Sequence, residues 1–280
     1  MTQLVPSLSD KEFKGLKDLI GKEAGIQISD FKKMFLVSRL LPRLRELGLQ
    51  NFKEYLRLLE STDFEKAEIG NLINRITTNE TRFFRETHHF EYLRREYLPS
   101  LVRVDQIPRK FFFWCAGCAT GEEAYSLAMI LADFRQDHPG IQIRILATDI
   151  DSEALNKARA GLFPEKTAEH IPTPLLKKYF LKGVGEWTGW IKAGSLLKGL
   201  IAFEHLNLHK PGGFSEGPFE GIFCRNVLIY FLPVSREKIL EVFFRRLTSS
   251  GLLFLGHSEQ LLDKRAIFRP LGNTIYQKIG

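Results

Sequence analysis

The stretch Phe112-Phe-Trp-Cys-Ala-Gly-Cys-Ala-Thr-Gly-Glu-Glu123 decides the fold of this chain. It begins as a hydrophobic strand, turns through small residues that include two glycines, and ends as an acidic helix start. Glycine permits a tight backbone turn and the close approach of a ligand, which is why such a unit opens nucleotide-binding α/β domains. The stretch therefore predicts an α/β domain with a ligand site at this turn.

The first turn of the helix indicates which ligand binds there. A pyrophosphate binds to bare N–H groups at a helix N-terminus, whereas Glu122 and Glu123 place two carboxylates there. These suit the helix dipole but repel a phosphate. S-adenosylmethionine, which carries hydroxyls, a sulfonium and an amino acid end, fits better. No G-x-G-x-x-G pattern follows the strand, which disfavours a dinucleotide oxidoreductase.

The composition is that of a globular protein. The chain has 280 residues, 44% of them hydrophobic, and a formal net charge of +7, which suits an acidic partner without choosing between nucleic acid and protein. No apolar run reaches the roughly 18 residues of a membrane span, and Met1–Pro6 lacks the features of a signal peptide. We therefore expect a cytoplasmic protein without membrane insertion.

The three cysteines lie in apolar surroundings, as in proteins of a reducing compartment. Cys115 and Cys118 form a C-x-x-C pair, which leaves a redox or zinc role open. No second pair completes a zinc site, so small residues lining a tight turn are the simpler interpretation.

The first 80 residues predict an all-helical unit. Apolar residues recur at helical spacing in four segments: 11–22, 30–48, 52–59 and 64–76. Ser9 or Asp10 caps the first and Asp30 the second, Gly48 ends the second, and Pro42 predicts a kink or restart within it.

The rest of the chain predicts a linking helix region at 81–109 and an α/β unit at 110–280. We expect strands at 111–116, 143–149, 200–204, 219–225 and 252–256, helices at 121–135, 152–160 and 235–248, and a final hairpin that turns at Gly272-Asn273. About forty residues, 161–199, are too long for a plain loop. They predict an inserted subdomain with a short antiparallel piece near Trp187–Ala193.

Polar residues follow the ends of the predicted strands, where an open parallel sheet binds its ligand. Asp149 ends the second strand and can accept both ribose hydroxyls of an adenosine, whereas Asp151 suits the N-cap of the next helix. The later strand ends supply Asn207, Leu208, Arg225, Asn226 and Tyr230. An apolar strand that ends in arginine is unusual, because a buried arginine needs an anionic partner.

Two further features have alternative interpretations. The segment Thr77–Glu86 either starts a capped helix with Phe83 and Phe84 in the core, or closes the cofactor site from the helical side. Seven basic residues against two acids lie between Phe31 and Arg57, and Lys32, Arg39 and Arg43 fall within roughly 40° of one helix face. That face is either ordinary solvated surface or a docking face for an acidic partner.

In sequence the chain resembles the chemotaxis receptor glutamate methyltransferase family, CheR. The matching pieces follow one another along nearly the whole chain: Thr77–Glu86, Ala119–Glu123, Ala147–Asp151, Asn207-Leu208, Phe219–Phe231 and Gly256–Glu259. The string Cys-Arg-Asn-Val-x-Ile-Tyr-Phe within the fifth is highly specific.

The resemblance implies an α/β fold: a class I S-adenosylmethionine-dependent methyltransferase sheet with helices on both faces, an inserted β-subdomain and an N-terminal all-helical domain. It implies methylation of receptor glutamates with S-adenosyl-L-homocysteine as product. The cofactor contacts it implies are Asn79, Thr81, Arg85, Glu122, Asp149, Asn207, Leu208, Arg225 and Asn226.

From this reaction we infer a catalytic arrangement and a partner. Arg225 or Arg85 orients a carboxylate, the substrate's or the cofactor's, and Tyr230 borders the acceptor pocket. The partner is the cytoplasmic helical bundle of membrane chemoreceptors, which meets the docking face formed by Lys32, Arg39 and Arg43. In some family members the β-subdomain also binds a peptide at the receptor's C-terminal tail, and Gly183–Gly189 occupies that place.

Two other functions fit the sequence less well. A nucleic acid methyltransferase usually carries Asn/Asp-Pro-Pro-Tyr/Phe after its fourth strand, and Arg225–Leu228 does not match it. A non-catalytic module that senses S-adenosylmethionine is disfavoured because every matched cofactor position is filled. We expect an enzyme that is monomeric, has no metal site and does not bind nucleic acid.

Overall fold

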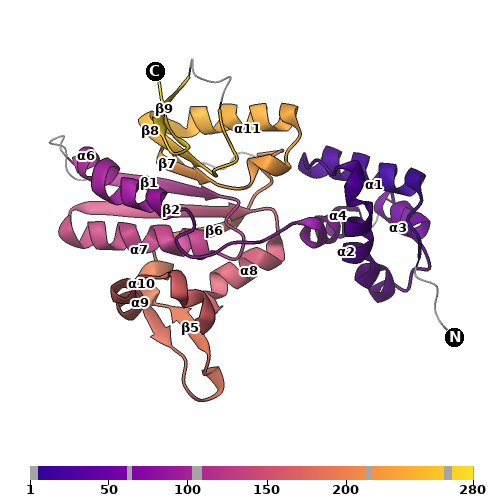
Figure 1. Ribbon diagram of the computed structural model, residues 1–280, viewed down its shortest axis with the longest axis horizontal. Coiled ribbons are helices and arrows are strands. Elements are labelled where there is room, and N and C mark those ends of the chain that lie inside the picture. The colour runs from indigo at the N-terminus through magenta and orange to yellow at the C-terminus, as the bar shows by residue number, and fades with distance from the viewer. Residues whose placement is uncertain (1–5, 62–64, 103–108, 212–215, 262–266, 280) are drawn as a thin grey trace.

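The computed structural model describes residues 6–61, 65–102, 109–211, 216–261 and 267–279. Figure 1 shows a helical unit beside a sheet flanked by helices, with a small β-subdomain below the sheet. None of the described helices is long and apolar enough to cross a membrane.

The helical unit consists of α1 (Asp10–Ala24), α2 (Lys33–Glu46), α3 (Phe52–Leu59) and α4 (Glu65–Ile76). Ser9 caps α1 through a capping box with Glu12. Asp30 does not cap the second helix, because it lies in a 3-10 turn (η1, Asp30–Lys32) that precedes α2.

Pro42 neither ends nor restarts α2, which continues through it to Glu46. Buried residues on both sides of the proline, including Leu40 and Leu44, belong to the same core. Burial of this apolar face therefore outweighs the hydrogen bond that the proline removes.

The main sheet has the strand order β6-β2-β1-β7-β8-β10-β9. Its strands are β1 (Arg109–Ala116), β2 (Ile141–Asp149), β6 (Ile201–His205), β7 (Phe219–Cys224), β8 (Leu247–Leu255), β9 (Phe268–Gly272) and β10 (Ile275–Lys278). The first five in spatial order run parallel, and the C-terminal hairpin adds two antiparallel strands. The predicted α/β sheet and hairpin are confirmed.

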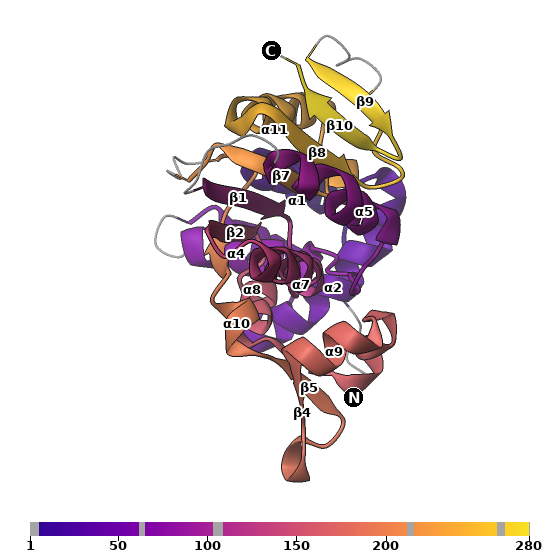
Figure 2. The same cartoon turned by 90° about the vertical axis from the view of Figure 1, so that its left-hand side faces the viewer.

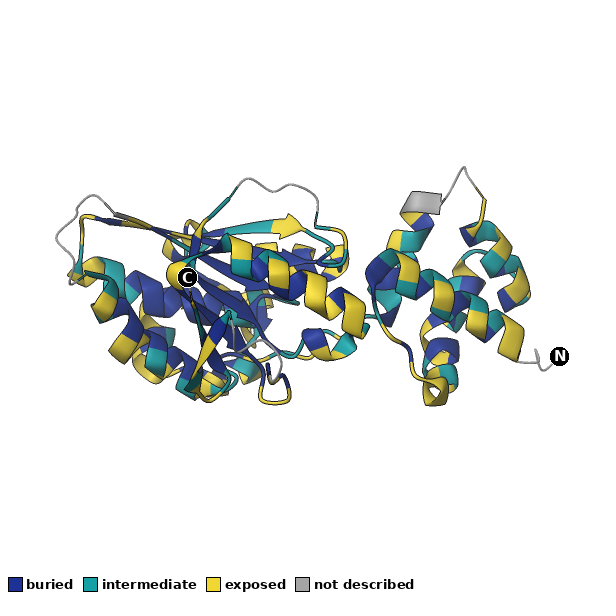
Figure 3. Ribbon diagram, turned by 90° about the horizontal axis from the view of Figure 1, so that it is seen from above, coloured by how far each residue is buried: buried dark blue, intermediate teal, exposed yellow. Residues whose placement is uncertain are grey.

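Helices cover both faces of the sheet. Alternate residues of β1 enter two different cores, because successive side chains of a strand point to opposite faces. Phe113 packs in the core that includes α7 (Glu122–Asp137), and Trp114 packs in the core that includes α11 (Pro233–Arg246). Figure 3 shows buried residues within the sheet and its helices and, separately, within the helical unit.

Residues 87–102, which follow the helical unit, are helical. They form α5 (Thr87–Tyr92), a π-helical turn (η2, Leu93–Tyr97) and α6 (Leu98–Val102). Phe90 and Leu93 are fully buried against the sheet, so this segment forms part of the α/β core.

The inserted β-subdomain lies between α8 (Ser152–Ala160) and β6. Its sheet has the order β3-β5-β4, with β3 (Leu162–Pro164), β4 (Phe180–Lys182) and β5 (Trp190–Ala193) antiparallel. Two short helices, α9 (Thr173–Tyr179) and α10 (Ser195–Lys198), accompany it. Figure 2 shows it projecting away from the main sheet, and the predicted antiparallel piece is part of it.

Candidate active site

A cleft opens where the helical unit meets the carboxyl edge of the main sheet. It contains about 1110 Å³ of empty space, part of which is open solvent. The structure brings these predicted residues together in its lining: Lys32, Asn79, Thr81, Arg85, Asp149, Leu208, Arg225, Asn226 and Tyr230. They come from segments up to about two hundred residues apart in the chain.

Backbone hydrogen bonds join the helical unit to the segment after β7. The N–H of Gln27 donates to the carbonyl of Tyr230 (2.7 Å), and the N–H of Leu232 donates to the carbonyl of Gly25 (2.9 Å). Tyr230 is therefore held at the junction of the two units, beside the cleft.

Asn207 is the first predicted cofactor residue that the structure places elsewhere. Its side-chain amide donates to the carbonyl of Glu23 (2.7 Å), and its Oδ1 accepts from the N–H of His209. The neighbours Leu206 and Leu208 line the cleft, whereas Asn207 does not. The Asn207 side chain thus bonds to the end of α1.

Asp149 is buried at the end of β2 and faces the cleft. Its two oxygens accept from the N–H groups of Ala119 (2.8 Å) and Asp151 (2.9 Å). Burial raises the pKa of this carboxyl, and the two N–H donors oppose the rise. The carboxylate is thereby fixed in direction while each oxygen keeps a lone pair for a hydroxyl donor.

Asp151 has the predicted role of N-cap, because its Oδ1 accepts from the N–H groups of Glu153 and Ala154. Its Oδ2 additionally accepts from the hydroxyl of Thr77 (2.8 Å) and the amide of Asn79 (2.6 Å). One carboxylate thus caps α8 and holds the segment that leaves the helical unit.

Glu122 is the second predicted residue outside the cleft lining. It is buried, and its Oε2 accepts from the hydroxyl of Thr120 (2.6 Å). Its neighbour Glu123 lines the cleft instead. Successive residues of a helix point about 100° apart, so the two neighbouring carboxylates lie in different surroundings.

Arg225 lies in a buried cluster with two carboxylates. Its Nη1 is 2.9 Å from Glu123 Oε2 and its Nη2 is 3.1 Å from Glu86 Oε2, and Nη2 also donates to the carbonyl of Arg85. Its side chain is 1% exposed. The anionic partners predicted for this arginine are therefore Glu86 and Glu123 of the protein itself. Both terminal nitrogens of its guanidinium are paired with them.

Arg85 has a different environment. It lines the cleft, and its Nη1 donates to the carbonyl of Glu80 (3.0 Å). Among the described residues, no acid forms a salt bridge with it. Of the two arginines predicted to orient a carboxylate, Arg85 is the one whose charge is available.

The loop after β7 is held by a single buried carboxylate, Glu259. Its oxygens accept from four N–H groups, those of Asn226, Val227, Ile229 and Gly256, at 2.6–3.3 Å. Asn226 takes a left-handed conformation there, with φ of 59°. Glu259 thus fixes the backbone that carries Asn226 into the cleft.

The turn after β1, which contains Gly117, packs closely against the same loop. A Cβ at Gly117, whose φ is +82°, would lie 2.5 Å from the Val227 side chain. The turn is therefore shaped by packing against the loop after β7 as well as by approach to a ligand.

The cysteines of this region are buried free thiols. Burial raises the pKa of Cys115 and Cys118 well above the ordinary value, and Cys115 donates to Glu123 Oε1 (3.0 Å). A thiol with a raised pKa is a poor nucleophile, which argues against the redox interpretation. Among the described residues, neither belongs to a group that could hold a metal.

The predicted docking face on α2 is only partly available. Lys32 and Arg39 are exposed, and Phe31 and Met34 beside them are exposed apolar residues. The charge of Arg43 is paired internally, because its guanidinium donates to Glu68 and Glu46 within the helical unit.

An apolar groove lies on the β-subdomain, away from the cleft. It is lined in part by Leu181, Val184, Trp187 and Trp190, all of them exposed. It includes part of the segment Gly183–Gly189 that the resemblance associates with a peptide.

Two carboxylates of the site, Glu86 and Glu259, were not singled out by residue type, although each lies within a quoted motif. Glu123 was noted only together with Glu122, as part of an acidic helix start. Glu86 and Glu123 both pair with Arg225, which lies far away in the chain, and spacing alone does not reveal such a partner.

The cleft fits S-adenosylmethionine. Asn226 Oδ1 is buried and has no hydrogen-bond partner, which suits a donor on the ligand. Asp149 offers a fixed carboxylate for hydroxyls, and Arg85 offers a cation for a carboxylate. These donors and acceptors complement the hydroxyls, amino group and carboxylate of the cofactor.

Comparison with known proteins agrees with this arrangement. The all-alpha domain of the CheR methyltransferases matches residues 11–77, and their SAM binding domain matches residues 79–277. The chemotaxis protein methyltransferase of Escherichia coli (strain K12) is 39% identical over 273 residues, which is 96% of this chain and 91% of that protein. That of Salmonella typhimurium is 39% identical over 280 residues, 99% and 92% of the two chains.

Among solved structures, the magnesium protoporphyrin IX methyltransferase of Synechocystis with bound SAM aligns over 90% of this chain and 95% of its own. Its identity is 11% and its TM-score 0.36, which adds nothing to the assignment. The two domain matches and the two chemotaxis relatives extend over nearly the whole sequence. The chain therefore belongs to the CheR methyltransferase family.

Proposed function

We propose that this protein transfers the methyl group of S-adenosylmethionine to glutamate side chains of membrane chemoreceptors. The products are glutamyl methyl esters and S-adenosyl-L-homocysteine, and the reaction serves adaptation in chemotaxis. The observation that supports it best is the cleft at the carboxyl edge of the sheet, which carries both a fixed acid and an available arginine.

The proposal divides the chain by role. Residues 1–80 dock the substrate, residues 81–109 link the units, and residues 110–280 hold the cofactor, with the β-subdomain at about 161–199. The cleft lining supports this division, because it includes residues of all three segments. The protein acts as a monomer on the cytoplasmic side of the membrane, without binding nucleic acid.

Asp149 and Asn226 would hold the cofactor, together with the backbone at Asn79, Thr81 and Leu208. When bound, the cofactor supplies an electrophilic methyl group. Asp149 accepts hydroxyl donors, because both its oxygens are already oriented by N–H groups. Asn226 offers the buried oxygen that lacks a partner within the protein.

The acceptor needs no general base, because a glutamate side chain is already ionised near pH 7. The protein therefore has two tasks: it aligns a carboxylate oxygen with the methyl group, and it excludes water from the nucleophile. Arg85 orients a carboxylate by charge-assisted hydrogen bonds. Arg225 positions Glu123 and the Arg85 carbonyl, and Tyr230 borders the acceptor side of the cleft.

The receptor helix would approach across the start of α2. Lys32 lines the cleft and also lies on the exposed surface, with its Nζ 5.9 Å from the centre of the Tyr230 ring. Arg39 continues this basic surface, and Phe31 and Met34 add apolar contact area. An acidic helix that reached Lys32 would have its glutamates at the mouth of the cleft. The groove at Trp187 and Trp190 would take a receptor tail peptide.

The first test incubates the protein with radiolabelled S-adenosylmethionine and receptor-containing membranes, and asks whether the label leaves as methanol in base. Base-labile label on receptor glutamates supports the proposal. Cofactor binding by calorimetry without label transfer contradicts the receptor assignment and points to a different acceptor or a sensing role. Absence of cofactor binding contradicts the whole assignment.

A further inference from the structure

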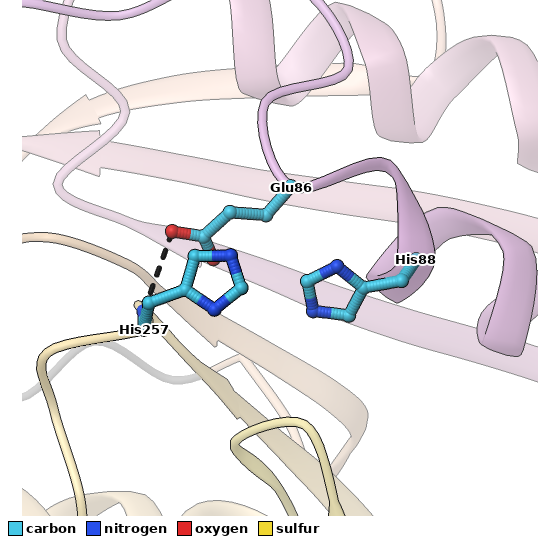
Figure 4. A group of neighbouring side chains, drawn as sticks. All are labelled: Glu86, His88 and His257. Atoms are coloured by element: carbon cyan, nitrogen blue, oxygen red, sulfur yellow. Dashed lines mark hydrogen bonds between the residues drawn. The ribbon is translucent and has the colours of Figure 1, made fainter.

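Three potential metal ligands lie together behind the wall of the cleft. Glu86, His88 and His257 each place a ligand atom within 4.8 Å of the other two. Figure 4 shows the carboxylate and the two imidazoles facing a common space, with Glu86 and His88 from the start of α5 and His257 from the loop after β8. None of the three lines the cofactor cleft.

The contacts within the group fix its shape. The N–H of His257 donates to Glu86 Oε1 (3.3 Å), and the rings of His88 and His257 stack with centroids 5.0 Å apart. Residues 171 positions apart in the chain are thereby held together, and the Nε2 of His88 is left without a hydrogen-bond partner.

One buried nitrogen in the group has no partner within the protein. The Nε2 of His88 is buried and forms no hydrogen bond. The Glu86 side chain is 7% exposed, and its Oε2 forms an ion pair with Arg225 Nη2 at 3.1 Å. Buried polar atoms in native proteins are nearly always satisfied, so the unpartnered nitrogen beside this carboxylate indicates a missing ligand.

The local charge favours a cation. Glu86 and Glu123 share the single guanidinium of Arg225, which leaves one negative charge in excess. A carboxylate between two imidazoles is a donor set that suits divalent transition metals, whereas Mg²⁺ and Ca²⁺ prefer all-oxygen sites.

We propose that Glu86, His88 and His257 form a site for one divalent transition metal ion such as Zn²⁺ or Co²⁺. Such an ion binds imidazole nitrogen and carboxylate oxygen at about 2.0–2.2 Å, so the three side chains close slightly around it. His257 is exposed, which gives the ion an entry path and leaves a further position open to water.

The test titrates Co²⁺ into tag-free, chelator-treated full-length protein and follows the visible absorption of the bound ion, with stoichiometry from calorimetry. His257→Gln is the principal variant, because the side chain is exposed and its loss should leave the fold intact. His88→Gln is the second. His170→Gln, which removes an exposed histidine that lies beside Glu169, is the matched control.

The expected result is one Co²⁺ per protein, with affinity at least about tenfold lower in His257→Gln and in His88→Gln, and unchanged in His170→Gln. Absence of stoichiometric binding would overturn the proposal. So would equal affinity in His257→Gln and the parent protein, or a loss of affinity in His170→Gln. Because this readout needs no cofactor and no receptor, it stands apart from the methyltransferase assay.

Discussion

Arg225 and Glu123 form a buried ion pair in the wall of the cleft: Nη1 and Oε2 are 2.9 Å apart, and the side chains are 1% and 12% exposed. Burial raises the pKa of Glu123, and the nearby arginine opposes the rise. The pair joins the start of α7 to the end of β7. It makes the cleft wall depend on a contact between residues 102 positions apart.

Replacing Arg225 with alanine should destabilise the protein as well as the site. Glu86 and Glu123 would be left as buried acids without their cation, which costs about 3–5 kcal/mol of unfolding free energy. Urea unfolding measures this, and calorimetry measures cofactor affinity on the fraction that folds. The exposed pair of Arg245 and Glu241 offers the control, where Arg245→Ala should cost less than about 1 kcal/mol. Unchanged stability, turnover and cofactor affinity in Arg225→Ala would contradict the assignment.

Arg85→Ala should weaken recognition of a carboxylate with little loss of stability. A hydrogen bond to a charged group contributes about 1.5–3 kcal/mol, so affinity should fall about 10- to 100-fold. A higher Kd for S-adenosylmethionine places the cofactor's carboxylate at Arg85, whereas a higher KM for receptor places the substrate's there. Arg82→Ala is the control, because Arg82 is exposed and does not line the cleft. If both constants stayed at their parent values, Arg85 would have no such role.

Arg39→Glu should raise the KM for receptor membranes about fivefold at low salt and leave cofactor affinity unchanged, since one exposed ion pair is worth up to about 1 kcal/mol. The difference should shrink as salt screens the surface charge. Arg43→Ala should behave differently, because it breaks the pair with Glu68 (2.6 Å) and lowers the unfolding midpoint. A salt-independent KM in Arg39→Glu would argue against electrostatic docking.

Glu259→Gln should destabilise the loop after β7. The substitution replaces one of two accepting oxygens with a donor and removes the charge that four N–H groups share, which should cost on the order of 3 kcal/mol. Urea unfolding and cofactor affinity should both report the loss. Gln260→Ala, at the exposed neighbouring position, should leave both unchanged. Parent-like values in Glu259→Gln would show that the loop is held by other contacts.

Glu220 should make stability depend on pH near neutrality. Burial raises its pKa from 4.5 to about 7, so the folded state binds the proton more tightly than the unfolded state. The stabilisation is complete below the unfolded pKa and is lost as pH rises through 7, amounting to about 1 kcal/mol between pH 6 and pH 8. Glu220→Gln keeps the oxygen that accepts from the Phe112 N–H and should flatten this slope. The exposed Glu241→Gln should retain it, and an equally steep slope in Glu220→Gln would exclude this group as its source.

Much of the fold could be predicted because its signals are local. The third helix has the bounds that its apolar spacing predicts, Phe52–Leu59, and α8 begins at the residue after its predicted cap, Asp151. The restart expected at Pro42 and the cap expected at Asp30 were wrong. Helix α2 continues past Pro42 because its apolar face is packed in the core of the helical unit. Asp30 does not cap α2 because it lies within the 3-10 turn that precedes this helix.

The site was harder to predict from the sequence, because its contacts join residues that are far apart in the chain. The strand ends correctly located Asp149 and Arg225 beside one cleft. Which of two adjacent glutamates faces it depends on the rotation of α7, and the bond from Asn207 to α1 depends on how the helical unit packs. Neither is encoded in the spacing of nearby residues.

One short segment touches both the cleft and the β-subdomain. Thr81 and Arg85 line the cleft, whereas Phe83 between them packs edge-on against Phe163 and Phe180, with ring centroids 4.9 and 5.6 Å away. A ligand on the β-subdomain that displaced these rings would shift the backbone that carries Arg85. Such a linkage is reciprocal: any factor by which a β-subdomain ligand changes cofactor affinity must equal the factor by which the cofactor changes that ligand's affinity.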